Sequence, residues 1–257
     1  MIPDGFASIE PQLLAWALGM IRPGAAMLVA PIFGSAIVPV QLRIILAFAI
    51  SVFLGGSVEI RPPELLSVDM LLVIVGEVIV GLGLGLIIQT AYAAATIAGE
   101  VIANAMGLGF ASMVDPSTSQ SNPALSQLLT LLTAFLFFAA DGHLLLIQAI
   151  RLSYDGYPLG IMPERSFFWD IASFGRAAFS AGLAIAVPVA FAVVLIQIIM
   201  GMLSRSAPQL NLFAVGLPAA TLAGFALMLV GLPVMAQSIT AALDLSFEMA
   251  MRLAGDR

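Results

Sequence analysis

The sequence predicts an all-α membrane protein built from long helices that prolines interrupt. Of its 257 residues, 61% are hydrophobic and only 9% are charged, whereas an average soluble domain is about 45–50% apolar and about 25% charged. The apolar residues form long blocks, and the segments between them are rich in proline and small polar residues, which end helices and form turns. A water-soluble enzyme is therefore excluded first.

Six apolar blocks follow one another along the chain. They comprise roughly residues 12–30, 40–56, 69–100, 124–151, 171–203 and 211–243. The third, fifth and sixth hold about 32 residues each, so a straight helix through each would span roughly 48 Å, against about 30 Å for a hydrocarbon core. Pro188 lies inside the fifth block, and Pro218 and Pro233 lie inside the sixth. Since an internal proline removes a helix hydrogen bond, we expect bent helices or helical hairpins there, packed tightly in an assembly.

The connections between the blocks set the boundaries of the blocks. Pro31 and Pro39 lie at the two ends of the first connection. The other connections are residues 61–64, 115–123, 153–170 and 205–209. Arginines at 151, 165 and 176 surround the fourth connection, which weakly indicates that it is cytoplasmic. Acidic residues share that loop, so the orientation stays open.

Several kinds of chemistry lack the residues they need. The chain has no cysteine, a single histidine and nine basic residues, all of them arginine, with a formal net charge of -6. Thiol nucleophiles, disulfides, zinc ribbons and iron–sulfur clusters are therefore excluded, and no basic patch favours nucleic acid. A phosphate-binding loop ending in Lys-Ser/Thr is absent from the sequence. We expect no catalytic residue, no metal and no cofactor. The first residues lack the positive charge of a signal peptide, so the first block should stay in the mature protein.

The third block carries a stripe of small and polar residues. At about 100° per residue, one face of a helix collects Glu77, Gly81, Gly85, Gln89, Tyr92, Thr96, Gly99 and Glu100. Small residues allow close helix contact in a membrane, and ionisable groups at membrane depth usually face protein or water. One interpretation is a helix that lines a conduit or a subunit seam; the alternative is packing inside the subunit with Glu77 near the headgroups. The glycines at 81, 83 and 85 lie inside an apolar helix, so packing explains them better than a dinucleotide fingerprint does.

Asp141-Gly142-His143 interrupts the fourth block. A metal site would need further ligands, and a catalytic dyad would need a nucleophile. We interpret the triplet as a polar corner between two helical halves, with a proton relay as the alternative.

An apolar, glycine-spaced segment follows the third block and ends at a turn. Irregular apolar backbone does not face lipid, so this segment is either buried in protein or blocks an aqueous space, as hydrophobic constrictions do. The candidate gate residues are Met106, Gly107, Leu108, Gly109, Phe110, Met113, Asp115 and Pro116. A re-entrant packing loop without a gating role is the alternative.

Motifs along nearly the whole chain resemble one family. They are Arg22, Ala30-Pro31-Ile32-Phe33, Val38-Pro39 and Arg43; then Ala98-Gly99-Glu100, Met106 to Ala111 and Asp115-Pro116; then Asp141-Gly142-His143; and finally Ala207 to Phe213 with Gly216 and Pro218. In this order they resemble the FliR family of flagellar export-gate proteins. One departure is Ala105, where the family usually has glutamine, so no side-chain polar contact is expected there.

The resemblance implies a non-enzymatic subunit of the type III export gate in the bacterial inner membrane, at the flagellar basal body. It implies a FliP-like part (residues 1–170) followed by a FliQ-like helical hairpin part (171–257), with a plug at about 106–123. The implied partners are FliP and FliQ, FlhB around the closed gate, FlhA below it, unfolded flagellar substrates and membrane lipid. The residues expected at subunit contacts are Arg43, Glu77, Gly81, Gly85, Glu100, Pro208, Gln209, Asn211 and Phe213.

Three other functions remain open. A small secondary transporter would need a midplane site, often between repeated halves, and the sequence shows no such halves. A structural nucleus would template FliP and FliQ without gating. A gate subunit of a virulence secretion system would share the architecture with weaker versions of the motifs.

Overall fold

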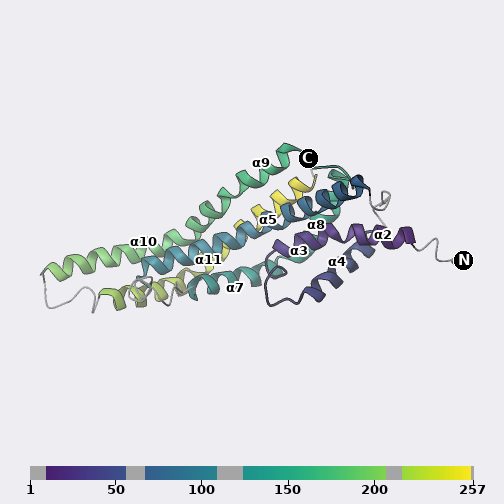
Figure 1. Cartoon of the computed structure of the whole chain (residues 1–257). Helices are drawn as coiled ribbons and strands as arrows, with labels where there is room; N and C mark the ends of the chain where they lie inside the picture. Colours follow the sequence, from purple (N-terminus) through teal and green to yellow (C-terminus); the bar gives the residue numbers. More distant parts are fainter. Residues whose placement is uncertain (1–9, 56–66, 109–123, 207–215, 256–257) are drawn as a thin grey trace, which may run out of the picture. The chain divides into compact units, whose positions relative to one another are not determined.

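Every regular element in the described part of the chain is a helix. The computed structural model describes residues 10–55, 67–108, 124–206 and 216–255. The helices, shown in Figure 1, are α2 (Glu10–Gly19), α3 (Ile21–Val29), α4 (Val40–Leu54), α5 (Val68–Ala105), α7 (Ala124–Ala139), α8 (Gly142–Gly156), α9 (Arg165–Phe174), α10 (Arg176–Ser206) and α11 (Leu217–Ala254). The predicted all-α class is confirmed.

Within the described ranges, four stretches are long and apolar enough to cross a membrane. They are Gln12–Val29, Val68–Ala105, Arg165–Arg205 and Leu217–Ala254. The broken pair of α7 and α8 makes a fifth if it counts as one span, and α4, with 15 residues, is apolar but shorter. Together with the composition, these stretches confirm a membrane protein.

The internal prolines do not divide their helices. α10 contains Pro188 and α11 contains Pro233, and each helix continues past its proline. Pro218 is the second residue of α11, in the first turn, where backbone N–H groups have no partner within the helix. A hairpin within either block is therefore wrong: loss of one hydrogen bond leaves the rest of each helical ladder in place.

A hairpin forms between these two blocks instead. A Cβ atom at Gly231 of α11 would lie 3.7 Å from Cγ2 of Val189 in α10. Val189 lies 17 residues before the end of α10, and Gly231 lies 14 residues after the start of α11. Similar distances from the connection are what an antiparallel helix pair requires, so consecutive helices pack side by side.

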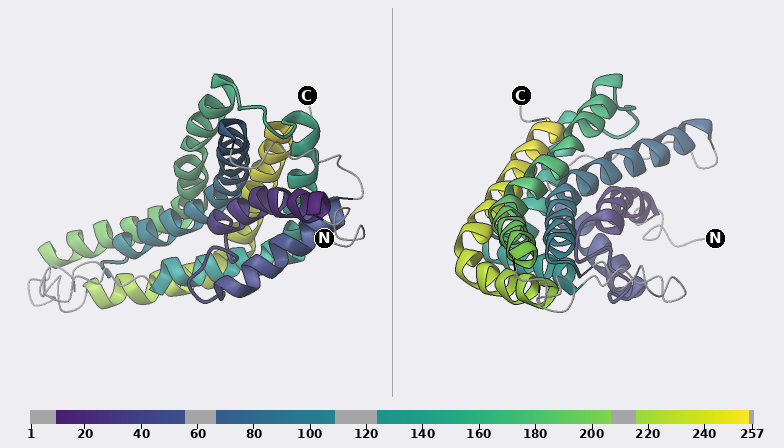
Figure 2. Two further views of the ribbon diagram at one scale, coloured as in Figure 1. Left: turned by 45° about the vertical axis from the view of Figure 1, so that its right-hand side comes forward. Right: turned by 90° about the vertical axis from the view of Figure 1, so that its left-hand side faces the viewer.

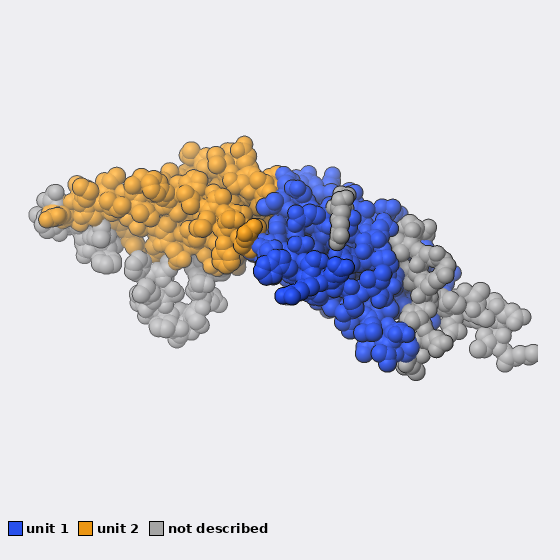
Figure 3. All heavy atoms as spheres, turned by 90° about the horizontal axis from the view of Figure 1, so that it is seen from above, with its two compact units in different colours: residues 1–90, 138–175, 244–257 blue, residues 91–137, 176–243 orange. Residues whose placement is uncertain are grey.

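The chain divides into two compact units, which Figure 3 colours separately. Unit 1 comprises residues 1–90, 138–175 and 244–257, and unit 2 comprises residues 91–137 and 176–243. Each unit combines segments that are distant in the sequence. The division at residue 170 into a FliP-like part and a FliQ-like part rests on resemblance along the sequence, so it stays a prediction.

The N-terminal helices of unit 1 form a small bundle. α3 packs against α4 and α8, and α2 packs against α4; α2, α3 and α4 lie close together in both views of Figure 2. The hydroxyl of Ser51 donates to the carbonyl of Trp16 at 2.8 Å. The rings of Trp16 and Phe48 meet edge to face, with centroids 6.2 Å apart. These contacts tie α4 to the first span.

Small residues bring the helices of unit 2 together. A Cβ atom at Gly182 of α10 would lie 2.9 Å from the carbonyl oxygen of Ala94 in α5. A Cβ atom at Gly99 would lie 2.6 Å from the backbone nitrogen of Ser126 in α7. Real Cβ atoms do not occupy such positions, so both sites require glycine for the observed helix spacing.

Candidate functional site

The glycine run in α5 is a two-sided packing surface. A Cβ atom at Gly85 would lie 2.5 Å from the carbonyl oxygen of Ala26 in α3, and one at Gly81 would overlap the carbonyl of Arg22. On the opposite side, a Cβ atom at Gly83 would lie 2.6 Å from Cζ of Phe167 in α9. The glycine run therefore packs against α3 on one face and against the Phe167 ring on the other, as the packing interpretation predicts.

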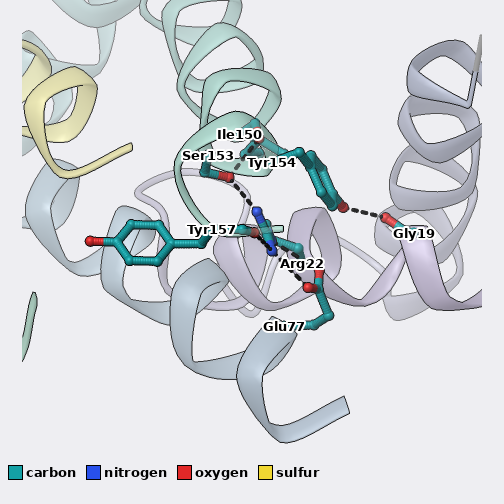
Figure 4. A network of polar contacts seen from close by, with 7 residues as sticks. All are labelled: Gly19, Arg22, Glu77, Ile150, Ser153, Tyr154 and Tyr157. Atoms are coloured by element: carbon teal, nitrogen blue, oxygen red, sulfur yellow. Dashed lines mark hydrogen bonds and ion pairs between the residues drawn. The ribbon is translucent and has the colours of Figure 1, made fainter. Parts of the chain in front are cut away.

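A buried ion pair joins α3 to α5, as Figure 4 shows. Arg22 of α3 and Glu77 of α5 each have about 1% of their surface exposed. Nε of Arg22 donates to Oε2 of Glu77 at 2.9 Å, and Nη2 donates to Oε1 at 2.6 Å. Nη1 donates to the Ser153 hydroxyl at 2.9 Å, and Nη2 also donates to the Tyr157 carbonyl at 2.7 Å. The carboxylate and guanidinium thus satisfy each other within unit 1, as buried charges must.

Tyr154 completes the same network on the side that faces the first span, Gln12–Val29. Its ring lies under the guanidinium, with Cζ of Arg22 3.9 Å from the ring centroid. Its hydroxyl donates to the carbonyl of Gly19 at 2.9 Å. In a continuing helix that carbonyl would accept from residue 23, but Pro23 has no N–H. The tyrosine therefore supplies the donor that the proline removes.

The stripe predicted on the third block divides between internal contacts and one exposed acid. Glu77, Gly81 and Gly85 are buried and have partners inside unit 1. Thr96 and Gly99 contact α7: the Ser126 hydroxyl donates to the Thr96 carbonyl at 3.2 Å. Glu100 is exposed.

Arg43, another predicted contact residue, is half-buried at the start of α4. Its Nη2 atom donates to the carbonyls of Ser35 and Val38, the latter at 3.0 Å. The arginine therefore holds the connection between α3 and α4.

The polar corner separates α7 from α8. Asp141 is exposed and adopts the left-handed conformation, with φ 53° and ψ 30°. Its carbonyl accepts from the N–H groups of Leu144 and Leu145 at 2.9 and 3.1 Å. His143 lies against the Phe138 ring, with centroids 5.6 Å apart, and its buried Nδ1 atom has no partner among the described residues. In the same ranges no group of His, Cys, Asp or Glu could hold a metal ion.

The C-terminal end of α5 carries a specific stop signal. Gly107 has φ 78°, its N–H donates to the Asn104 carbonyl at 3.0 Å, and the N–H of Leu108 donates to the Ala103 carbonyl at 3.0 Å. This pair of bonds with a left-handed glycine is the Schellman motif. The helix therefore ends at the start of the predicted plug.

Side chains of unit 2 fix this helix end in place. Nε2 of Gln197 in α10 donates to the carbonyl of Ala105 at 2.7 Å. The single hydroxyl proton of Thr221 in α11 is shared between the carbonyl of Met106 at 3.2 Å and the carbonyl of Leu217 in its own helix at 2.9 Å. Met106 is fully buried, and a Cβ atom at Gly224 would lie 2.5 Å from its Cγ atom. The Gln197 side chain of α10 therefore binds the backbone of Ala105, whose own side chain is apolar.

Several predicted residues cannot be placed. Gly109, Phe110, Met113, Asp115 and Pro116 of the gate, and Pro208, Gln209, Asn211 and Phe213 of the subunit contacts, lie outside the described residues.

Sequence reasoning missed four contributors to these sites. Tyr154 and Ser153 complete the arginine network, and Gln197 and Thr221 cap the end of α5. For Tyr154 a signal existed in Pro23, which leaves a carbonyl four residues earlier without its helical donor. The others are ordinary polar residues whose partners only the tertiary structure identifies.

The fold and these sites define a polytopic all-α membrane protein whose polar residues mainly join helices. Residues 13–246 match the family described as bacterial export proteins, family 1. The chain is 32% identical over 226 residues to the flagellar biosynthetic protein FliR of Escherichia coli K12, covering 88% of this chain and 86% of the relative. It is 31% identical over 228 residues to the protein of that name from Bacillus subtilis 168, covering 87% and 88%. The chain belongs to the FliR family of bacterial export proteins.

Proposed function

We propose that the chain is an export-gate subunit of the flagellar type III secretion apparatus, which helps to form and close a conduit for unfolded flagellar proteins across the bacterial inner membrane. Family membership supports the coarser description, a membrane component of the flagellar export apparatus. The relatives named above are flagellar proteins, which favours this branch over a virulence system.

The observation that carries the gating proposal is the fixed end of α5. Two carbonyls at this end accept side-chain hydrogen bonds from α10 and α11, and Met106 is enclosed between helices. A plug must be held at its root if it is to close a conduit reproducibly. The Schellman motif at Gly107 and the two capping side chains provide such a root within unit 2.

FliP and FliQ are the proposed neighbours in the gate, with FlhB and FlhA as further partners. Glu100 is the exposed acid through which we propose that α5 meets a neighbouring chain. Large apolar side chains are also exposed on α10, including Phe179, Phe191 and Met202. An exposed acid in a long apolar helix requires a polar partner or water at membrane depth.

The subunit acts as a passive part of the gate in this proposal. The sequence lacks lysine and therefore any Walker-type phosphate loop, so energy for export comes from partners or from the proton gradient. Closure consists of excluding water from an apolar constriction.

Shortening the segment from Gly107 to Met113 tests gating against a purely structural nucleus. We expect the shortened chain to assemble with FliP and FliQ but to make the membrane leaky to ions, measured as loss of a pH gradient in cells that express the gate. The intact chain at equal expression is the control. An assembled shortened variant that leaves the membrane tight would support the structural nucleus instead.

A further inference from the structure

Arg22 occupies a site that the rest of unit 1 builds around it. The groups that receive the guanidinium come from other elements: Glu77 from α5, Ser153 and Tyr154 from α8, and the carbonyl of Tyr157, the C-cap residue of α8. A helix C-terminus favours a cation. The site therefore combines a carboxylate, a helix end, a hydroxyl and an aromatic face, all directed at one group.

The site matches the shape of a guanidinium as well as its charge. A guanidinium has five N–H donors in one plane, and the hydrogen bonds of Arg22 use donors on all three nitrogens. Two parallel bonds to Glu77 form the bidentate arrangement that a carboxylate and a guanidinium share. Stacking on the Tyr154 ring uses the flat face, which the compact ammonium group of lysine lacks.

We propose that Glu77, Ser153, Tyr154 and the Tyr157 carbonyl form a guanidinium-binding site, which α3 fills from within the same chain. The partners lie 55 and 131 residues from Arg22 in the sequence, so the site joins the first span to α5 and α8. A shift of α3 by one helical turn, about 5.4 Å, would separate the charges and leave both unpaired in an apolar interior. This proposal does not depend on the export function, because it concerns how the chain holds its own helices.

Chemical rescue tests the site directly. The Arg22→Ala variant of the full-length chain opens the site, and we expect its thermal unfolding midpoint in detergent to fall on the order of 10 °C, followed by tryptophan fluorescence. Methylguanidinium at millimolar concentrations too low to denature should restore at least half of this loss. Methylammonium at the same ionic strength should not, because it cannot form the bidentate bonds or stack.

Two matched variants separate specific rescue from general effects. Glu77→Ala also breaks the pair but leaves Arg22 in the site, so methylguanidinium should not stabilise it. Arg252→Ala removes an exposed arginine from the last turn of α11, so it should lower the midpoint by at most about 4 °C and should leave the response to methylguanidinium unchanged. Equal rescue of Glu77→Ala, rescue by methylammonium, or an unchanged midpoint in Arg22→Ala would each overturn the proposal.

A second comparison applies if Arg22→Ala does not accumulate in membranes. Replacing both charges, as Arg22→Met with Glu77→Met, removes the unpaired carboxylate that the single change creates. The double variant should therefore accumulate to several times the level of Arg22→Met alone. Accumulation no better than that of the single variant would show that the carboxylate does not depend on Arg22, and the site assignment would be wrong.

Discussion

The hydrogen bond between Tyr154 and Gly19 provides a sharp test of how the first span is stabilised. Pro23 leaves the Gly19 carbonyl without its helical donor, and the Tyr154 hydroxyl takes that position at 2.9 Å. Tyr154→Phe removes only the hydroxyl and keeps the ring under Arg22. Pro23→Ala restores an N–H that can donate to Gly19. The two substitutions should therefore compensate each other.

The structure sets the size of the expected effect. Tyr154 has 5% of its surface exposed, so water does not readily replace its hydroxyl. A buried carbonyl left without a partner costs about 1–3 kcal/mol. For a chain of this length each kcal/mol shifts the thermal midpoint by about 2–4 °C, so Tyr154→Phe should lower it by about 5 °C. In the Pro23→Ala background the same change should lower it by only about 1 °C.

A double-mutant cycle on the purified full-length chain measures this coupling. Thermal unfolding in detergent, followed by tryptophan fluorescence, gives the four midpoints needed. Pro23→Ala has its own effect on the unfolded chain, but the cycle cancels it. An equal loss from Tyr154→Phe in both backgrounds would show that the hydroxyl does not compensate for the proline.

Three further outcomes follow from contacts in the two units. Gly85→Ala should lower the thermal midpoint because the added Cβ meets the α3 backbone, with a cost of about 1–3 kcal/mol. At Gly201 an added Cβ would meet no described atom within 4 Å outside its own stretch of helix. Gly201→Ala should therefore be neutral or slightly stabilising, and equal loss in both variants would contradict the packing argument. Gln197→Leu combined with Thr221→Val should free the end of α5 and increase ion leakage through assembled gates; a tight membrane would count against a fixed plug root. Glu100→Leu should weaken co-purification with FliP, and unchanged co-purification with normal motility would mean that this acid does not bind a neighbour.

The helices could be predicted from the sequence because hydropathy and length depend on local composition. The blocks at 69–100 and 171–203 correspond closely to α5 and α10. The hairpin alternative for the fifth and sixth blocks failed because a proline removes only one hydrogen bond. Whether that loss breaks a helix depends on its neighbours, which composition does not describe.

The partners of the polar residues could not be predicted for a related reason. Glu77 and Glu100 fall on the same stripe of α5, yet Glu77 is buried against Arg22 whereas Glu100 is exposed. Arg22 of α3 covers Glu77, whereas the α7 backbone approaches the neighbouring Gly99 and leaves Glu100 exposed. A periodicity of 100° per residue identifies the stripe, but it cannot show which neighbour covers each part of it.

Part of the apolar surface of the chain remains exposed after these internal contacts are made. On α10, Phe179 and Met202 are 65% and 69% exposed, and they are separated by 23 residues of continuous helix, or about 35 Å. A hydrocarbon core of about 30 Å cannot cover both unless the helix is tilted by roughly 30° or more. The alternative is that neighbouring chains cover one end. Because Glu77, Gly81 and Gly85 already have partners within the chain, the case for neighbouring chains depends on this apolar surface and on Glu100, rather than on the buried part of the stripe.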